Sequence, residues 1–107
     1  MNREAFVLGL RSNLEMADAD RRKIIRRSVK KFPWKLKCIV AMEEMAELQQ
    51  QLSKKIRGYE DRTGILEEMA DVYICLSMLE CICDISPEEM QQAIDVKLQR
   101  ERGRLRE

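Results

Sequence analysis

Two short acidic motifs are the strongest candidates for chemistry in this chain of 107 residues. Glu44 and Glu47 stand three positions apart in the segment MEEMAE. Glu68 and Asp71 repeat that spacing in the segment LEEMAD. Side chains three positions apart on a helix project about 60° from one another, so each segment presents two carboxylates on one helical face. We therefore expect two helices that each carry a pair of carboxylates able to hold the same ligand.

Both pairs fall within apolar helix faces. Glu68 projects about 20° from Cys75 and from Leu79, and Glu44 projects about 40° from Leu48. The alternative is that the acids form a solvated face or pair with Lys and Arg, as most acids on helices do. A carboxylate that faces a core, however, loses several kcal/mol of hydration unless a cation compensates it. Two such pairs on neighbouring helices favour a bound metal ion.

The ligand types that the chain offers indicate which metal ion the carboxylates would bind. The chain has no histidine, which excludes catalysis by imidazole and zinc sites that contain His. None of its four cysteines belongs to a CxxC pair, so no thiolate zinc site is visible either. An all-oxygen site suits a hard cation, so we expect Mg²⁺, with Mn²⁺ as the alternative.

Helices must position these carboxylates, and the sequence predicts four of them. Charged residues make up 36% of the chain and aromatic residues 5%, with two prolines and four glycines, which favours an all-α fold. Ser86 and Glu89 form a capping box around Pro87, and the other expected N-caps are Asp18 or Asp20 and Asp61 or Thr63. The predicted helices span about 18–32, 34–57, 65–83 and 87–104.

The chain is short enough to form one domain. Residues 1–17 have weak helical periodicity without clear caps and are expected to form an N-terminal arm or an extra helix, before an all-α domain over 18–107. No apolar run approaches the roughly 20 residues of a membrane span, so we predict a cytoplasmic protein with no membrane partner and mostly buried, reduced cysteines.

The paired motifs resemble a known family. EEMAE at 43–47 and EMAD at 68–71 are similar to the EExxE and ExxD motifs of MazG-like nucleotide pyrophosphohydrolases, within the all-α NTP pyrophosphatase superfamily. The resemblance implies a helical protomer that completes a four-helix-bundle core by dimerising, sometimes pairing again into a homotetramer. By the same resemblance Glu44, Glu47, Glu68 and Asp71 are the Mg²⁺ ligands. Glu43, the leading acid, is then the catalytic candidate, which supports the ligands or activates water.

The reaction that this resemblance implies is Mg²⁺-dependent hydrolysis of a nucleoside triphosphate to the monophosphate and pyrophosphate, as in clean-up of the nucleotide pool. Lys97, Arg100 and Arg104 fall on one face of the last predicted helix and resemble the phosphate-binding residues of the family's terminal helix. The alternative for these three is ordinary solvated charge. Trp34 is a candidate for stacking on the base, although a single Trp after Pro is more often a packing anchor.

A second basic cluster allows a different function. Nine of the seventeen residues from 21 to 37 are Lys or Arg, and such density is also found where proteins bind nucleic-acid phosphates. We favour a solvated or substrate-facing role for this segment, since Phe32 and Trp34 are its only aromatic residues. The alternative to the enzyme is a non-catalytic helical oligomerisation or nucleic-acid-binding module that uses residues 21–37.

Overall fold

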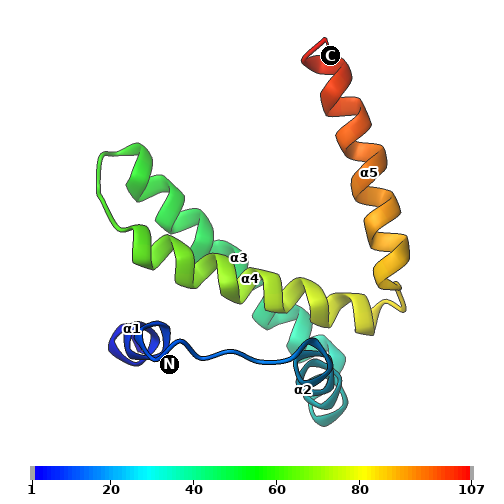
Figure 1. Ribbon diagram of the computed structural model, residues 1–107, viewed down its shortest axis with the longest axis horizontal. Coiled ribbons are helices and arrows are strands. Elements are labelled where there is room, and N and C mark those ends of the chain that lie inside the picture. Colours follow the sequence, from blue (N-terminus) through cyan, green and yellow to red (C-terminus); the bar gives the residue numbers. More distant parts are fainter. Residues whose placement is uncertain (1, 107) are drawn as a thin grey trace.

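The structure, a computed structural model, describes residues 2–106 and consists of five helices (Figure 1). They are α1 (Arg3–Arg11), α2 (Asp18–Lys31), α3 (Trp34–Ile56), α4 (Arg62–Ile82) and α5 (Pro87–Arg104). No strand occurs within these described residues, which confirms the all-α prediction. The four predicted helices are present with ends shifted by a few residues, and the N-terminal segment contains the extra helix α1.

Capping residues start two of the helices as the sequence predicted. The Ser86 hydroxyl accepts a hydrogen bond from the Glu89 amide at 3.1 Å, and the Glu89 carboxylate accepts one from the Ser86 amide at 3.1 Å. Asp61 accepts a bond from the Gly64 amide at 2.9 Å and so begins α4. Both caps satisfy amide groups that have no partner inside the helix.

The starts of the two N-terminal helices differ from the prediction. Asp18 is the first residue of α2 and neither it nor Asp20 is the N-cap; that position is Ala17, which makes no side-chain hydrogen bond. Acidic residues in a first turn interact favourably with the helix dipole without capping. Helix α1 does have a cap, because the Asn2 side chain accepts a bond from the Ala5 amide at 2.8 Å.

The antiparallel pair of α3 and α4 forms the body of the molecule (Figure 1). Small side chains lie at its centre, where Ala41 and Cys75 are the buried apolar residues. Helices α1 and α2 pack on α4, whereas α5 leads away from the pair after the turn at residues 83–86 (Figure 1). The two helices that carry the acidic motifs are therefore the two that pack most closely together.

The single chain leaves much apolar surface exposed. Its accessible surface is 9098 Å², against about 6,200 Å² for a compact monomer of this size. Its radius of gyration is 16.3 Å, against about 13 Å for a compact domain of this length. The extended α5 contributes to both differences, because every described residue from 91 onward is exposed, and the other helices also expose large apolar side chains.

The four cysteines are all free thiols. Cys75 is buried and Cys38 is half-buried, as predicted, but Cys81 and Cys83 are exposed. The prediction of mostly buried thiols is wrong for these two because they lie at the end of α4, where α5 turns away from the rest of the chain. Within residues 2–106, no helix combines the length and the apolar character that crossing a bilayer requires.

Candidate metal centre

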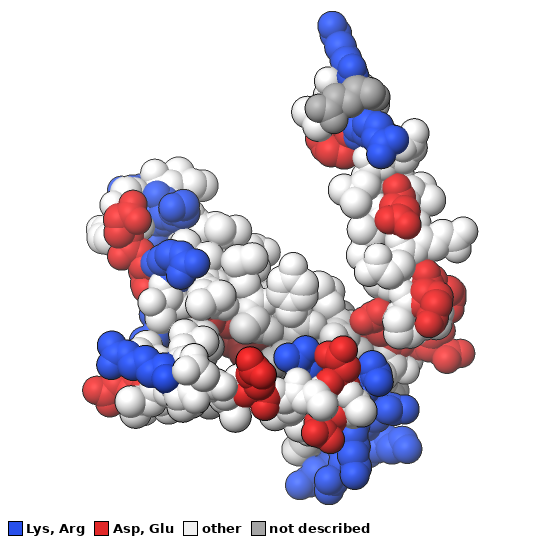
Figure 2. All heavy atoms as spheres, viewed as in Figure 1, with Lys and Arg blue, Asp and Glu red and all other residues white. Residues whose placement is uncertain are grey.

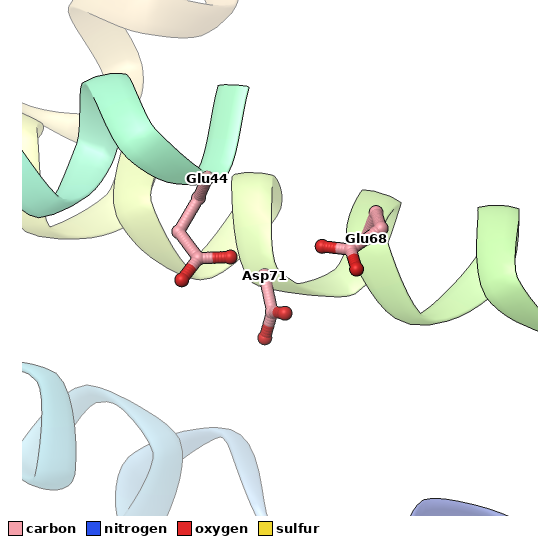
Figure 3. A group of neighbouring side chains, drawn as sticks. All are labelled: Glu44, Glu68 and Asp71. Carbon is pink, nitrogen blue, oxygen red and sulfur yellow. The ribbon is translucent and has the colours of Figure 1, made fainter. Parts of the chain in front are cut away.

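Three of the four predicted ligands meet between α3 and α4. Glu44, Glu68 and Asp71 each offer a carboxylate oxygen, and these oxygens lie within 4.8 Å of one another. Figure 3 shows Glu44 leaving α3 toward Asp71, with the Glu68 carboxylate directed back toward both from the next turn of α4. Among the described residues this is the one group of acidic or thiol side chains close enough to share an ion.

The antiparallel arrangement explains which side chains face one another. Glu44 lies opposite Asp71, and Glu47 lies opposite Glu68. The order is reversed because the two helices run in opposite directions, so a later residue on α3 faces an earlier residue on α4. Glu47 itself is exposed at the edge of the group. We use the name acidic cluster for Glu44, Glu47, Glu68 and Asp71.

Two oxygens of the acidic cluster are both buried and unpartnered. Glu44 Oε2 and Glu68 Oε2 are inaccessible to solvent and have no hydrogen-bond partner among the described residues. Buried polar atoms in folded proteins nearly always have a partner, and two orphaned carboxylate oxygens on facing helices need a positive one. The donor set is thus suited to a hard divalent cation.

Burial and mutual repulsion raise the pKa values of carboxyl groups in the acidic cluster. Burial raises the pKa of Glu44 to about 7, and the negative charges of Asp71, Glu47 and Glu68 add to the effect. Burial likewise raises the pKa of Glu68, with the charge of Glu47 as the next cause. Burial also raises the pKa of Asp71. A cation bound here would favour the charged forms that this environment disfavours.

Glu43 lies outside the acidic cluster. It precedes Glu44 on α3, so its side chain is turned by about 100° along the helix. Its side chain is exposed, and it is not part of the three-residue group. Its assignment as the catalytic carboxylate therefore still depends on the resemblance of the motif.

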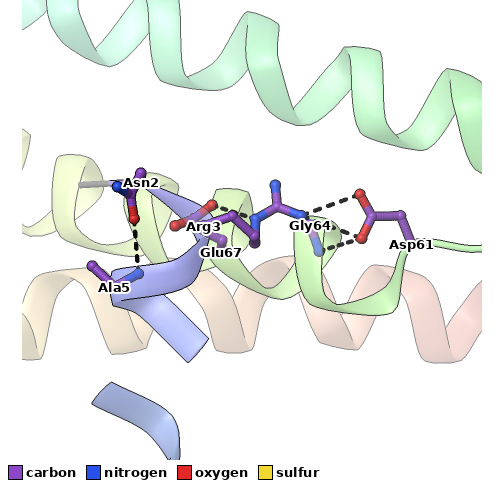
Figure 4. A network of polar contacts seen from close by, with 6 residues as sticks. All are labelled: Asn2, Arg3, Ala5, Asp61, Gly64 and Glu67. Atoms are coloured by element: carbon purple, nitrogen blue, oxygen red, sulfur yellow. Dashed lines mark hydrogen bonds and ion pairs between the residues drawn. The ribbon is translucent and has the colours of Figure 1, made fainter. Parts of the chain in front are cut away.

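An ion-pair network anchors α1 beside the acidic cluster (Figure 4). Arg3 donates from Nε to Glu67 Oε1 at 2.9 Å and from Nη1 to Asp61 Oδ2 at 3.2 Å. The Glu67 side chain is only 14% exposed, and its charge contributes to the raised pKa of both Glu68 and Asp71. Sequence reasoning missed Arg3 because its contact with Glu67 spans 64 residues and follows no spacing rule.

Lys37 places a positive charge on the same face of α3 as Glu44. It precedes Glu44 by two helical turns on one face, and its Nζ donates to Ser28 Oγ at 2.7 Å. Burial and the carboxylates of Glu44 and Asp71 raise the pKa of the Cys75 thiol, whereas Lys37 opposes that rise. Lys37 belongs to the basic segment 21–37, and its spacing of seven from Glu44 is the signal in the sequence that distinguishes it from the other basic residues there.

The remaining candidate residues do not reach the acidic cluster within one chain. Trp34 is exposed at the first position of α3, about 15 Å of helix before Glu44, with the Lys35 ammonium 5.7 Å from its ring. The three basic candidates of α5 are exposed on the helix that leads away from α3 and α4 (Figure 1). They are Lys97, Arg100 and Arg104.

The basic segment 21–37 forms an exposed positive region around α2, seen as the blue area at the lower right of Figure 2. Of the seven basic residues of α2, only Arg21 forms an ion pair among the described residues, with Asp18 at 2.9 Å. The positive charge of this helix is therefore largely unneutralised by the protein itself.

No protein-family model matches the chain, and no curated protein or solved structure gives a significant match to it. The function must therefore be inferred from the side chains themselves, and above all from the acidic cluster.

Proposed function

We propose that the protein is a Mg²⁺-dependent nucleoside triphosphate pyrophosphohydrolase. The observation that carries the proposal is the convergence of Glu44, Glu68 and Asp71 with two buried, unpartnered oxygens. These are the positions at which the motifs resemble those of MazG-like enzymes. Shared position and a suitable oxygen donor set thus point to the same metal-dependent chemistry.

The acidic cluster would hold the ion through Glu44, Glu68 and Asp71, with Glu47 at the exposed edge. When bound, Mg²⁺, or Mn²⁺ in its place, neutralises phosphate charge and lowers the pKa of water. The three side chains are half-buried between two packed helices, and one oxygen each of Glu44 and Glu68 is inaccessible to solvent. Arg3 pairs with the carboxylate of the neighbouring Glu67 and so offsets part of the negative charge beside the acidic cluster.

The reaction joins the oxygen of a water molecule to the α-phosphorus and breaks the bond from that phosphorus to the oxygen bridging to the β-phosphate. The products are a nucleoside monophosphate and pyrophosphate, and a proton is released. Glu43 is our candidate for the carboxylate that accepts this proton or supports the ligands, since it is exposed and adjoins Glu44. Lys37 supplies positive charge for the phosphate chain from the same helix.

The proposed enzyme is a dimer, in which a second copy of the chain covers surface that one copy leaves exposed. The exposed surface exceeds that of a compact monomer by roughly 2,900 Å² per chain, or about 5,800 Å² for two chains, which is at the upper end of the total surface that obligate homodimers bury. On α5, Ile94 and Leu98 are exposed, and this helix has no extensive contact with the other described helices. We propose that dimerisation, and in some cases pairing of dimers, covers α5, and that its Lys97, Arg100 and Arg104 serve the phosphates in the assembled protein.

The test is a panel of nucleoside and deoxynucleoside triphosphates assayed for pyrophosphate with Mg²⁺ or Mn²⁺. We expect release of pyrophosphate, not orthophosphate, from at least one substrate. Glu68→Gln keeps the size of the side chain but removes a ligand charge, and should lower the rate on the order of 100-fold while the helical content persists.

Glu60→Gln is the matched control, because Glu60 is exposed in the loop before α4 and outside the acidic cluster. It should keep the wild-type rate. A fully active Glu68→Gln protein would refute the assignment of the metal ligands.

The unneutralised charge of α2 favours one second candidate, the nucleic-acid-binding module. That function would be supported if no nucleotide in the panel were hydrolysed and the protein bound labelled DNA or RNA with a steep dependence on salt. Absence of such binding in an active protein would rule it out.

A further inference from the structure

An apolar pocket of about 580 Å³ lies between α2, α4 and the linker that joins α1 to α2. That volume is within the usual range of small-molecule sites. Its apolar walls come from all three segments. They are Leu14 and Met16 of the linker, Ile24 and Ile25 of α2, and Ile74 and Met78 of α4.

The pocket adjoins the acidic cluster along α4. Ile74 and Met78 follow Asp71 by one and two turns, and their side chains project about 60° and 20° from that of Asp71. Figure 3 shows the Asp71 carboxylate directed toward the side of α4 on which the N-terminal helices lie. A ligand that extends along this side of α4 can therefore touch both places.

Positive charge lies beside the pocket. Ser28 lines the pocket and accepts the hydrogen bond from Lys37, which shares a helix face with Glu44. Arg21 stands at the edge of the same pocket. Apolar, cationic and acidic side chains thus lie near one another on α2, α3 and α4, and these are the three kinds of group that suit a nucleobase, its phosphates and a metal ion.

We propose that the pocket binds the nucleobase of the triphosphate whose phosphates lie at the acidic cluster, an assignment that rests on the proposed function. Six of the ten lining residues are large and apolar, so the base is held mainly by apolar contact, while Arg21, Ser28 and Ser77 can donate hydrogen bonds to its edge. Tyr73, which also lines the pocket and is exposed, supplies an aromatic ring on which a base can stack.

The experiment compares a nucleotide with a ligand that has phosphates but no base. The variants are Ile24→Ser and Ile74→Ser, on opposite walls at positions 51% and 47% exposed. KM and kcat are measured for the best triphosphate of the panel, and inorganic tripolyphosphate with Mg²⁺ is titrated as a competitive inhibitor. Each variant should raise KM about 5- to 10-fold and leave the inhibition constant of tripolyphosphate within about twofold.

Ile56→Ser is the control, because Ile56 is 87% exposed at the end of α3 and does not line the pocket. Its kinetic constants should match those of the wild type. An unchanged KM in both pocket variants would overturn the pocket assignment and leave the proposed function standing. Equal weakening of nucleotide and tripolyphosphate would also overturn it. A wild-type protein that hydrolyses no triphosphate would instead overturn the proposed function, and the pocket assignment with it.

Discussion

Glu44 is the residue of the acidic cluster whose charged form is most clearly destabilised by its surroundings. Its pKa rises from an ordinary 4.5 to about 7 because burial and three neighbouring carboxylates disfavour its charge. At neutral pH the residue is close to its midpoint, so either a proton or a metal ion can relieve the repulsion. The two should therefore compete for this site.

The raised pKa predicts how stability depends on pH. Between pH 4.5 and about 7 the folded protein binds more protons than the unfolded chain, so the free energy of unfolding falls as pH rises. In the absence of divalent cations we expect a loss of about 1–3 kcal/mol between about pH 5 and pH 8. Denaturant titrations across this range measure it.

Two substitutions make this test specific to Glu44. Glu44→Gln should flatten the dependence on pH, whereas Glu43→Gln, at the exposed neighbouring position, should keep it. Mg²⁺ should stabilise the wild type more at pH 8 than at pH 6, because fewer protons must be displaced. Equal slopes in the wild type and Glu44→Gln would contradict the assignment.

The sequence predicted the residues of the cluster but not all of their neighbours. Spacing of three on each helix places Glu44 with Glu47 and Glu68 with Asp71, since that geometry is local. The contact of Arg3 with Glu67 could not be predicted, because it depends on where α1 packs after folding. Local periodicity carries no information about such long-range pairs.

At the scale of elements, the first turns of α4 are fixed by α1. Asp61 caps α4 through the Gly64 amide and also accepts from Arg3, and these bonds lower the pKa of its carboxyl. Gly64 is buried, and a Cβ there would meet the Asp61 carboxylate and the Arg3 guanidinium. The glycine is thus explained by the close approach of the Asp61 carboxylate and the Arg3 guanidinium, whereas the sequence predicted only a turn residue before the helix at 65–83.

Arg3→Ala tests whether this network holds α1 in place. The Arg3 side chain is 40% exposed, so removing its two ion pairs should lower the free energy of unfolding by only about 1 kcal/mol. Amide hydrogen exchange in α1 should nevertheless become faster, because its main polar contacts with α4 are gone.

The control is Arg21→Ala, which removes an ion pair within α2 and should leave exchange in α1 unchanged. Unchanged protection of α1 in Arg3→Ala would mean that apolar contacts of the half-buried Phe6 and Val7 hold the helix instead.

The helices themselves were largely predictable, because their caps and apolar spacing are local properties of the sequence. The capping box at Ser86 and the cap at Asp61 were confirmed. The angle between α4 and α5 was not predictable, because short turns allow many directions and α5 makes no extensive contact with the other described helices. Exposure of Cys81 and Cys83 follows from that direction.

At the scale of the whole molecule, the exposed apolar surface predicts self-association. Leu66, Met69 and Leu76 form an exposed stripe on α4, on the side away from the acidic cluster. Single chains of this length rarely leave such a stripe uncovered. We expect sedimentation at micromolar concentration to give a dimer or a larger assembly, with a melting temperature that rises with concentration.

Met69→Glu should shift the protein toward the monomer and lower its melting temperature, because a charge in the covered stripe loses its hydration. Ile56→Glu, at an 87% exposed position, is the control and should associate as the wild type does. A wild type that stays monomeric and melts independently of concentration would contradict the dimer.

Binding of a divalent cation by the acidic cluster is the claim on which the proposed chemistry depends, and Mn²⁺ titration followed by electron paramagnetic resonance measures it without any substrate. The wild type should bind Mn²⁺ and release it to excess Mg²⁺, and Glu68→Gln should weaken binding on the order of 10- to 100-fold. A wild-type protein that binds no Mn²⁺, or a Glu68→Gln variant that binds it equally well, would contradict metal binding by the acidic cluster.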